Sequence, residues 1–183
     1  MSTPEPELRL ATIADVPALR ELIPRSVRAL SRGYYSDAQI EGAIAHVFGP
    51  DTQLIADGTY FVVTAVREIV ACGDWSRRRT LFGGDQMKGA EDPLLDPARE
   101  AARIRAFFVA PEWARRGLAS RLMEACMAAA RGAGFRALEL GATLPGEPLY
   151  RGFGFETLER TSTPLPGGKS LPIVHMRRTL AAP

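Results

Sequence analysis

The chain has 183 residues, 46% of them hydrophobic and 24% charged, with a net charge of +2 at pH 7. These ordinary values predict a single globular domain and exclude a disordered chain, a coiled coil and the basic excess of a dedicated nucleic-acid binder. No apolar run approaches the roughly 20 residues of a membrane span, and the first residues lack the features of a secretory signal, so we expect a cytoplasmic protein. Cys72 and Cys126 stand alone in apolar runs, which predicts buried, reduced thiols and no metal site.

The first third of the chain predicts a short strand followed by helices. Residues 8–12 alternate as a strand does, and the apolar residues of segment 16–27 follow helical spacing after a cap at Asp15. Pro24 lies inside that helical pattern and predicts a kink or a break, so two short helices are an alternative. A second capped helix is expected between Ser36 or Asp37 and the Gly49-Pro50 stop.

Two adjacent tyrosines, Tyr34 and Tyr35, lie in the loop between these helices. In one interpretation, one ring belongs to the core and the other to the surface. In the other, both rings wall a substrate pocket, as aromatic side chains on loops often do.

The middle of the chain predicts a hairpin followed by a long irregular segment. Residues 59–66 and 69–75 are rich in β-formers and are joined through a short turn, which indicates two antiparallel strands. Residues 76–101 are too long and too broken for an ordinary connection, which favours a substrate-covering loop, with disorder of its middle as the alternative. Its three arginines, Arg77 to Arg79, suggest either a phosphate contact or a solvated loop.

The stretch 103–120 predicts a strand, a turn and a helix. The strand ends before Pro111, and helical spacing runs from Leu118 to about Arg131. The first turn of a helix presents unpaired backbone N–H groups, and Gly117 and Ala119 leave the approach free of bulk, so an anion such as a pyrophosphate fits there. An ordinary capped surface helix is the alternative reading of the same residues.

The last third predicts one more strand–helix–strand unit. Gly132 and Gly134 end the preceding helix, and residues 136–141 form a strand that should lie parallel to the strand before the helix. A short helical segment is expected at 147–152. A last strand is expected at 171–180.

The order of these elements and two motifs resemble the GNAT superfamily of acyl-CoA-dependent N-acetyltransferases over nearly the whole chain. Residues 114–119, Ala-Arg-Arg-Gly-Leu-Ala, match the family signature Gln/Arg-x-x-Gly-x-Gly/Ala from Gly117 onward, whereas Ala114 departs from it. Residues 149–155 look like the family motif Phe/Leu-Tyr-x-x-x-Gly-Phe. The resemblance implies one α+β domain over residues 1–183, with a three-layer arrangement and a mixed, mostly antiparallel sheet that contains a splayed parallel strand pair and is flanked by helices.

The resemblance further implies acetyl-CoA as the cofactor. The backbone at the helix start should hold its pyrophosphate, and the central strand should pair with its pantetheine arm. The residues expected to bind it are Phe108, Val109, Arg115, Arg116, Gly117, Leu118, Ala119, Ser120 and Thr143.

For the chemistry, the resemblance implies Tyr150 as general acid, with simple packing against the cofactor as the alternative. The N–H of Val109 is the expected donor to the thioester oxygen. The central strand supplies no acidic residue as a base, so the candidates are Asp74, Asp85, Glu139, His46, His175 or a water relay.

The implied acceptor is a primary amine on a small molecule or at an amino terminus. Tyr34, Tyr35, Asp74 and Trp75 are the expected substrate-binding residues, in a pocket suited to an apolar amine or to a cation held over a ring. A non-catalytic acyl-CoA-binding or sensor domain is the alternative function, and a nucleotide-binding protein is disfavoured by the missing glycine motifs. Family members often form homodimers, although no stretch of the sequence identifies an interface.

Overall fold

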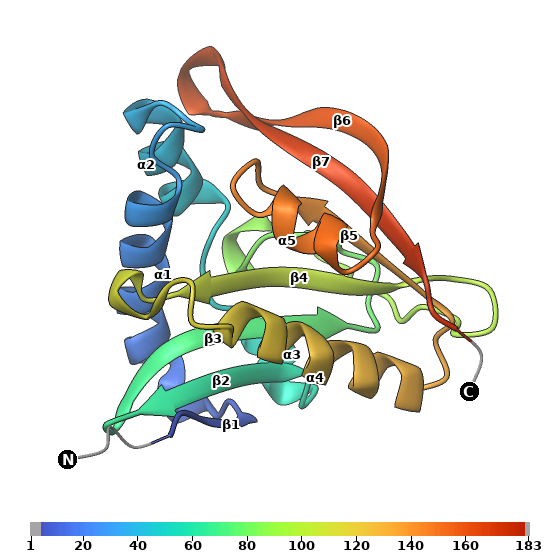
Figure 1. The fold of residues 1–183 in the computed structure, drawn as a ribbon. Coiled ribbons are helices and arrows are strands. Elements are labelled where there is room, and N and C mark those ends of the chain that lie inside the picture. The colour runs from blue at the N-terminus through green and yellow to red at the C-terminus, as the bar shows by residue number, and fades with distance from the viewer. Residues whose placement is uncertain (1–4, 182–183) are drawn as a thin grey trace.

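The computed structural model describes residues 5–181 and contains a seven-stranded sheet in the order β1-β2-β3-β4-β5-β7-β6 (Figure 1). The strands are β1 Glu7–Leu10, β2 Tyr60–Ala65, β3 Glu68–Ser76, β4 Ala102–Val109, β5 Ala137–Ala142, β6 Glu156–Leu165 and β7 Lys169–Thr179. The helices are α1 Val16–Leu30, α2 Asp37–His46, α3 Thr52–Ala56, α4 Leu118–Gly132 and α5 Glu147–Gly152. Figure 1 shows α1 and α2 behind the sheet and α4 in front of it, so helices flank the sheet on both faces.

The expected α+β fold with a splayed parallel pair is confirmed. Every described strand pairing is antiparallel except the one between β4 and β5. That pairing consists of two residue pairs only, Ala102 with Leu138 and Arg103 with Glu139. Beyond them the two strands separate, which leaves an opening in the middle of the sheet.

Pro24 does not break α1, so the alternative of two short helices is wrong. The helix is continuous from Val16 to Leu30 with Pro24 inside it. Its face buries Leu19, Ile23 and Val27 against the sheet, each worth about 1.5–3 kcal/mol. Together they exceed the roughly 3 kcal/mol that an internal proline costs.

The predicted hairpin is confirmed, because β2 and β3 pair antiparallel through a tight turn. Val66 and Arg67 in that turn have positive φ values of 49° and 67°, as a twisted two-residue hairpin turn requires. The second helix also begins as expected, since the Ser36 side chain accepts a hydrogen bond from the Gln39 N–H. The short helix α3 and the edge strand β6 have no counterpart among the predicted elements.

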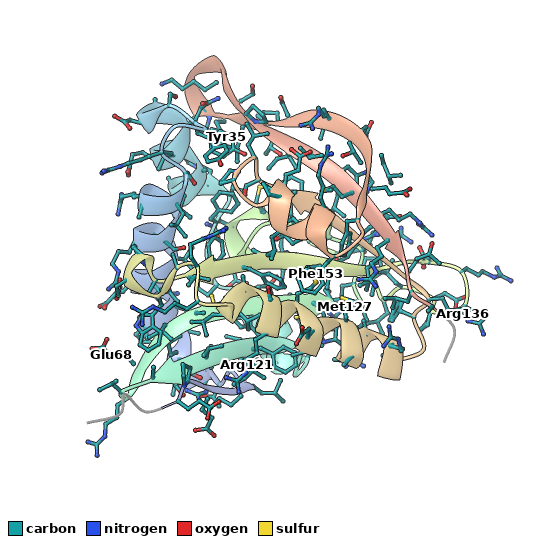
Figure 2. All side chains as sticks on the ribbon, viewed as in Figure 1. Tyr35, Glu68, Arg121, Met127, Arg136 and Phe153 are labelled. Atoms are coloured by element: carbon teal, nitrogen blue, oxygen red, sulfur yellow. The ribbon has the colours of Figure 1, made fainter. Side chains whose placement is uncertain are left out.

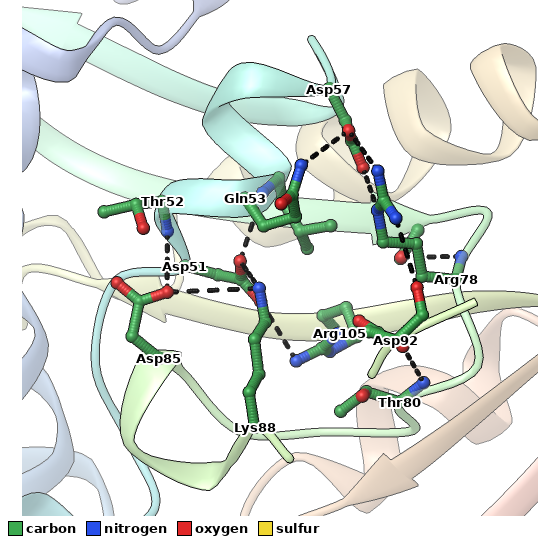
Figure 3. A network of polar contacts seen from close by, with 12 residues as sticks. Asp51, Thr52, Gln53, Asp57, Arg78, Thr80, Asp85, Lys88, Asp92 and Arg105 are labelled. Atoms are coloured by element: carbon green, nitrogen blue, oxygen red, sulfur yellow. Dashed lines mark hydrogen bonds and ion pairs between the residues drawn. The ribbon is translucent and has the colours of Figure 1, made fainter. Parts of the chain in front are cut away.

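Segment 76–101 is anchored at several points along its length. Arg78 pairs with Asp57 at the end of α3, and its backbone bridges to Leu94 on the returning arm. Lys88 pairs with Asp51, which precedes α3 (Figure 3). All three arginines have local contacts, because Arg77 donates to the Asp57 carbonyl and the Arg79 guanidinium lies 4.0 Å from a Glu100 carboxylate oxygen.

Both cysteines are fully buried, as expected, with free thiols at Cys72 and Cys126. Between residues 5 and 181, no group of three or more His, Cys, Asp or Glu side chains is placed to hold a metal ion. Within the same range, no helix has the length and apolar character needed to cross a membrane.

Candidate active site

A cavity of about 560 Å³ occupies the opening between β4 and β5. At one end, called the helix end, it is lined by Trp113, Ala114, Arg115, Gly117, Leu118, Ala119 and Ser120. At the other, called the loop end, it is lined by Phe48, Phe82, Gly83 and Arg105. A second cavity of about 650 Å³ lies on the surface of α1 and is lined by several arginines. Its described lining contains no residue of β4 or β5.

The helix end has the properties of an anion site. The N-cap of α4 is Gly117, with φ +80°. Because glycine has no side chain, nothing caps the first-turn N–H groups, and the first turn contains no acidic residue. Arg115 adds a positive charge to the cavity wall from a left-handed backbone conformation, φ +62°. These features fit the pyrophosphate of coenzyme A.

Most expected cofactor-binding residues line the cavity, but Arg116 does not. Phe108, Val109 and Thr143 belong to its wall together with the residues of the helix end. The guanidinium of Arg116 instead lies over the Trp113 ring, 4.9 Å from the ring centroid. This cation–π contact holds Arg116 outside the lining, so only one of the two arginines faces the cavity.

The N–H of Val109 already has a partner. It donates to the Ser26 hydroxyl of α1 at 3.1 Å, in a buried contact. Ser26 also lines the cavity, and its own hydroxyl hydrogen remains able to donate. The Ser26 hydroxyl therefore stands beside the Val109 amide in the cavity wall as a second group able to donate.

Tyr150 lies in the cavity wall on α5, between two aromatic rings. It is 6% exposed, with its ring centroid 6.2 Å from that of Phe107 and 6.0 Å from that of Phe155. Burial raises the pKa of its phenol well above the usual value, and Asp74 adds to this shift. The phenol therefore stays protonated at neutral pH and can donate a hydrogen bond.

The two adjacent tyrosines have different environments. Tyr35 is buried, and its hydroxyl donates to the Pro172 carbonyl at 2.7 Å and accepts from the Leu144 N–H at 2.9 Å. Figure 2 shows it near α2. Tyr34 is 52% exposed and lines the cavity, whereas Tyr35 does not. One ring is therefore structural and the other is available to a ligand.

Neither Asp74 nor Trp75 belongs to the described lining of the cavity, although Asp74 contacts a residue that does. Asp74 accepts the Ala106 N–H at 3.1 Å, where β3 and β4 shift register, and Ala106 itself lines the cavity. Burial raises the pKa of the Asp74 carboxyl to about 7, against an opposing effect of Arg105. Trp75 packs in the core against Phe135 and is not brought to the cavity.

The other candidate bases are engaged elsewhere. Glu139 accepts hydrogen bonds from Arg103 and Arg177, and His175 lies 3.1 Å from the same carboxylate. Asp85 accepts the Thr52 N–H at 3.0 Å. None of these side chains belongs to the described lining of the cavity, and neither does His46.

Sequence reasoning missed the side chains that form the loop end. Phe82 crosses to β5, where a Cβ on Gly141 would lie 2.7 Å from its ring. Phe48 packs edge-on against Phe108. Arg105 is the charged member of this group and belongs to the central strand β4. An arginine within an apolar strand is itself a signal, because such a charge is seldom buried without a specific reason.

Comparisons with known proteins agree with this geometry. A family model described as the acetyltransferase (GNAT) family matches residues 26–155. No curated protein sequence matches the chain. Among solved structures, it is similar to a GCN5-related N-acetyltransferase from Rhodopseudomonas palustris, with 19% identity and a TM-score of 0.71 over 98% of this chain and 99% of that one.

Two further solved structures share the fold. The PaiA N-acetyltransferase from Thermoplasma acidophilum, determined in complex with coenzyme A, is 14% identical with a TM-score of 0.63, over 96% of this chain and 99% of that one. The ribosomal-protein-S18-alanine N-acetyltransferase from Escherichia coli is 14% identical with a TM-score of 0.60, over 98% and 96% of the two chains.

Proposed function

Because the chain belongs to the acetyltransferase (GNAT) family and is therefore an acyltransferase that uses acetyl-CoA, we propose that it acetylates a primary amine on a small molecule or at an amino terminus. The observation that carries this proposal is the cavity between β4 and β5, with an uncapped helix N-terminus at one end and Tyr150 in its wall.

The helix end supplies the cofactor contacts. Backbone N–H groups of the first turn of α4 and the Arg115 guanidinium bind the pyrophosphate, and the exposed edge of β4 near Phe108 pairs with the pantetheine arm. Bound acetyl-CoA supplies the acetyl thioester. Ala114 offers no side-chain donor, which leaves the backbone contacts intact because they require only amide geometry.

Tyr150 is the donor to the departing sulfur. A full proton transfer from this phenol to a thiolate is uphill, since burial raises the phenol pKa and a thiolate has a pKa of about 8.5. The hydroxyl instead stabilises the developing negative charge on sulfur by a charge-assisted hydrogen bond. The Ser26 hydroxyl, which accepts the Val109 N–H, does the same for the carbonyl oxygen with its own hydrogen.

Asp74 is the best-placed base among the candidates. A carboxyl group with a pKa of about 7 is half ionised at neutral pH, which suits proton transfer. It lies behind Ala106, so a water molecule in the cavity has to carry the proton from the amine to it. In this mechanism Asp74 contributes one limb of the pH–rate profile near pH 7, and Asp74→Asn removes that limb.

Segment 76–101 acts as the substrate-covering loop. Its support is Phe82, which reaches from the segment to Gly141 on β5 and thereby closes the loop end of the cavity.

The test of the proposed function is the substitution Tyr150→Phe. We expect kcat for acetyl transfer to fall at least about tenfold with the Kd for coenzyme A unchanged, because a charge-assisted hydrogen bond is lost and packing is kept. Tyr60→Phe is the matched control, since that phenol is equally buried but bonds to the Cys72 sulfur, away from the cavity. Unchanged turnover in Tyr150→Phe would refute the assignment. A wild-type protein that binds coenzyme A and acetylates no amine would support the alternative of a binding domain.

A further inference from the structure

We propose that the loop end of the cavity is an anion subsite, in which Arg105 binds a carboxylate carried by the acceptor, so that the acceptor is an amino acid with an apolar side chain. This inference rests on the proposed acetyl transfer to an amine and names the class of that amine.

The first support is the hydrogen-bonding state of Arg105. Its side chain is 1% exposed, and its Nη2 donates to the Gly83 carbonyl and lies 3.2 Å from an Asp51 carboxylate oxygen. Its Nε and Nη1 are buried and have no hydrogen-bond partner among residues 5–181. Buried donors without a partner are unusual in a native fold, and Arg105 lines the cavity. A ligand oxygen that reaches this part of the cavity wall would supply the partner that these two donors lack.

The second support is the charge balance around this guanidinium. The Asp51 carboxylate is shared, because Lys88 pairs with its other oxygen (Figure 3). Arg105 and Asp74 form no ion pair within the described residues, and Asp74 is only partly ionised at neutral pH. Lys88 also lies 3.9 Å from an Asp85 carboxylate oxygen, so two carboxylates face the two cations. This pairing engages only Nη2 of Arg105, and its other two nitrogens have no charged partner among the described residues.

The third support is the composition of the cavity wall. Its described lining contains two arginines, Arg105 and Arg115, and no acidic residue. A polyamine or another multiply charged cation would find no counter-charge there. Phe48 and Phe82 supply apolar surface beside Arg105, which suits a side chain without charge.

The position of Arg105 along β4 limits the size of the acceptor. Arg105 precedes Phe107 by two residues, which corresponds to about 7 Å along a strand. The amine and carboxylate of an α-amino acid are attached to one carbon and lie closer together than this, so the Arg105 side chain has to lean along the strand toward Phe107 for its guanidinium to reach the carboxylate. The amino terminus of a protein carries an amide where the amino acid has its carboxylate, so it offers Arg105 one uncharged carbonyl oxygen in place of two charged oxygens.

The experiment compares two ligands that differ only in this group. N-acetylphenylalanine and N-acetylphenylalaninamide are titrated by calorimetry into the full chain saturated with coenzyme A. We expect the acid to bind at least about tenfold more tightly, as a charge-assisted hydrogen bond in a buried site predicts. Equal affinities within twofold would overturn the inference. This readout does not depend on turnover.

The variant Arg105→Met removes the charge and the donors while keeping most of the side-chain volume. It should bring the two affinities within about twofold, whereas the control Arg103→Met, on the same strand but paired with Glu139, should keep the preference for the acid. A retained preference in a folded Arg105→Met would overturn the inference, and if this variant does not fold, the wild-type comparison decides.

Turnover separates the inference from the proposed function. Acetylation of phenylalanine with at least about tenfold higher kcat/KM than phenylalaninamide supports both. Acetylation of both with equal kcat/KM leaves the proposed function standing and overturns the subsite. Tight binding of the acid without acetylation of any amine supports the subsite and contradicts the proposed function.

Discussion

Asp74 is 4% exposed, and burial raises the pKa of its carboxyl group to about 7, although Arg105 and the Ala106 N–H oppose the shift. In the unfolded chain the same group has a pKa near 3.8. The folded protein therefore holds a proton on Asp74 that the unfolded chain releases between these two values. The stability that this group contributes is fully present below pH 3.8 and is lost as the pH rises through about 7.

Asp74→Asn should make this loss visible. The amide still accepts the Ala106 N–H but cannot ionise, so the variant gains stability relative to the wild type as the pH rises, by roughly 2–4 kcal/mol in total. Urea unfolding at pH 5 and pH 9 measures the difference. Asp37→Asn, at an exposed position on α2, should show no such trend. A variant effect of equal size at both pH values would contradict the assigned pKa.

Part of the site could be predicted from the sequence, because its motifs act through the backbone. Gly117 together with the apolar period that begins at Leu118 predicts the helix start, and Tyr150 follows from the second motif. Arg105 and Phe82 could not be assigned, since their roles depend on a loop that folds back across the sheet. Nothing local distinguishes Tyr34, which faces the cavity, from Tyr35, which bonds to the Pro172 carbonyl 137 residues away.

At the scale of elements, segment 76–101 and α3 act as a unit. Asp51 and Asp57 stand at the two ends of α3, and each carboxylate binds a cation of the segment: Lys88 and Arg78 respectively (Figure 3). The segment also carries Phe82 and Gly83 to the cavity. The loop end of the cavity therefore keeps its shape only while segment 76–101 is ordered.

Arg78→Ala should loosen this segment selectively. Its guanidinium makes two bonds to Asp57 and one to the Asp92 carbonyl, so we expect trypsin to cleave within 76–101 several times faster than in the wild type. Arg79→Ala is the matched control, because the Arg79 side chain is 65% exposed and its nearest carboxylate oxygen lies 4.0 Å away. Equal cleavage rates for the two variants would argue against the anchoring role of Arg78.

The elements that the sequence predicted correctly have a clear apolar pattern. In α4 the buried residues follow the helical period, and in β3 they form one continuous run. β6 was missed because it is an edge strand, exposed over its first seven residues, and so shows no alternation. α3 was missed because its five residues are too few for a helical period, although Asp51 was available as a cap. The predicted break at Pro24 was wrong because burial of the α1 face outweighs the low helix propensity of proline.

At the scale of the whole molecule, the reactivity of the two cysteine thiols measures how often the fold unfolds globally. Cys72 and Cys126 are both fully buried, and burial raises the pKa of Cys72 to about 12. Thiolates are the reactive form, so a thiol reagent should modify neither residue until the fold opens.

Thiol labelling under native conditions should therefore be slow and should follow unfolding. We expect Cys72 and Cys126 to react together, and acetyl-CoA at about 100 times its Kd to slow both about 100-fold, since it stabilises the folded state by about 2.7 kcal/mol. Mass spectrometry of labelled peptides over time measures both rates. Rapid modification of one cysteine alone would show a local opening that the structure does not predict.

The opening between β4 and β5 also bears on how freely such a protein can change in evolution. On the proposed mode of binding, the strand edge and the start of α4 recognise the cofactor through backbone groups, which are the same in every residue except proline. Side chains along these segments are then free to vary, as at Ala114, and solved structures with only 14–19% identity retain the fold. Proline is the single replacement that would delete such a contact outright. Selection therefore acts on the backbone conformation of these segments and constrains few of their side chains.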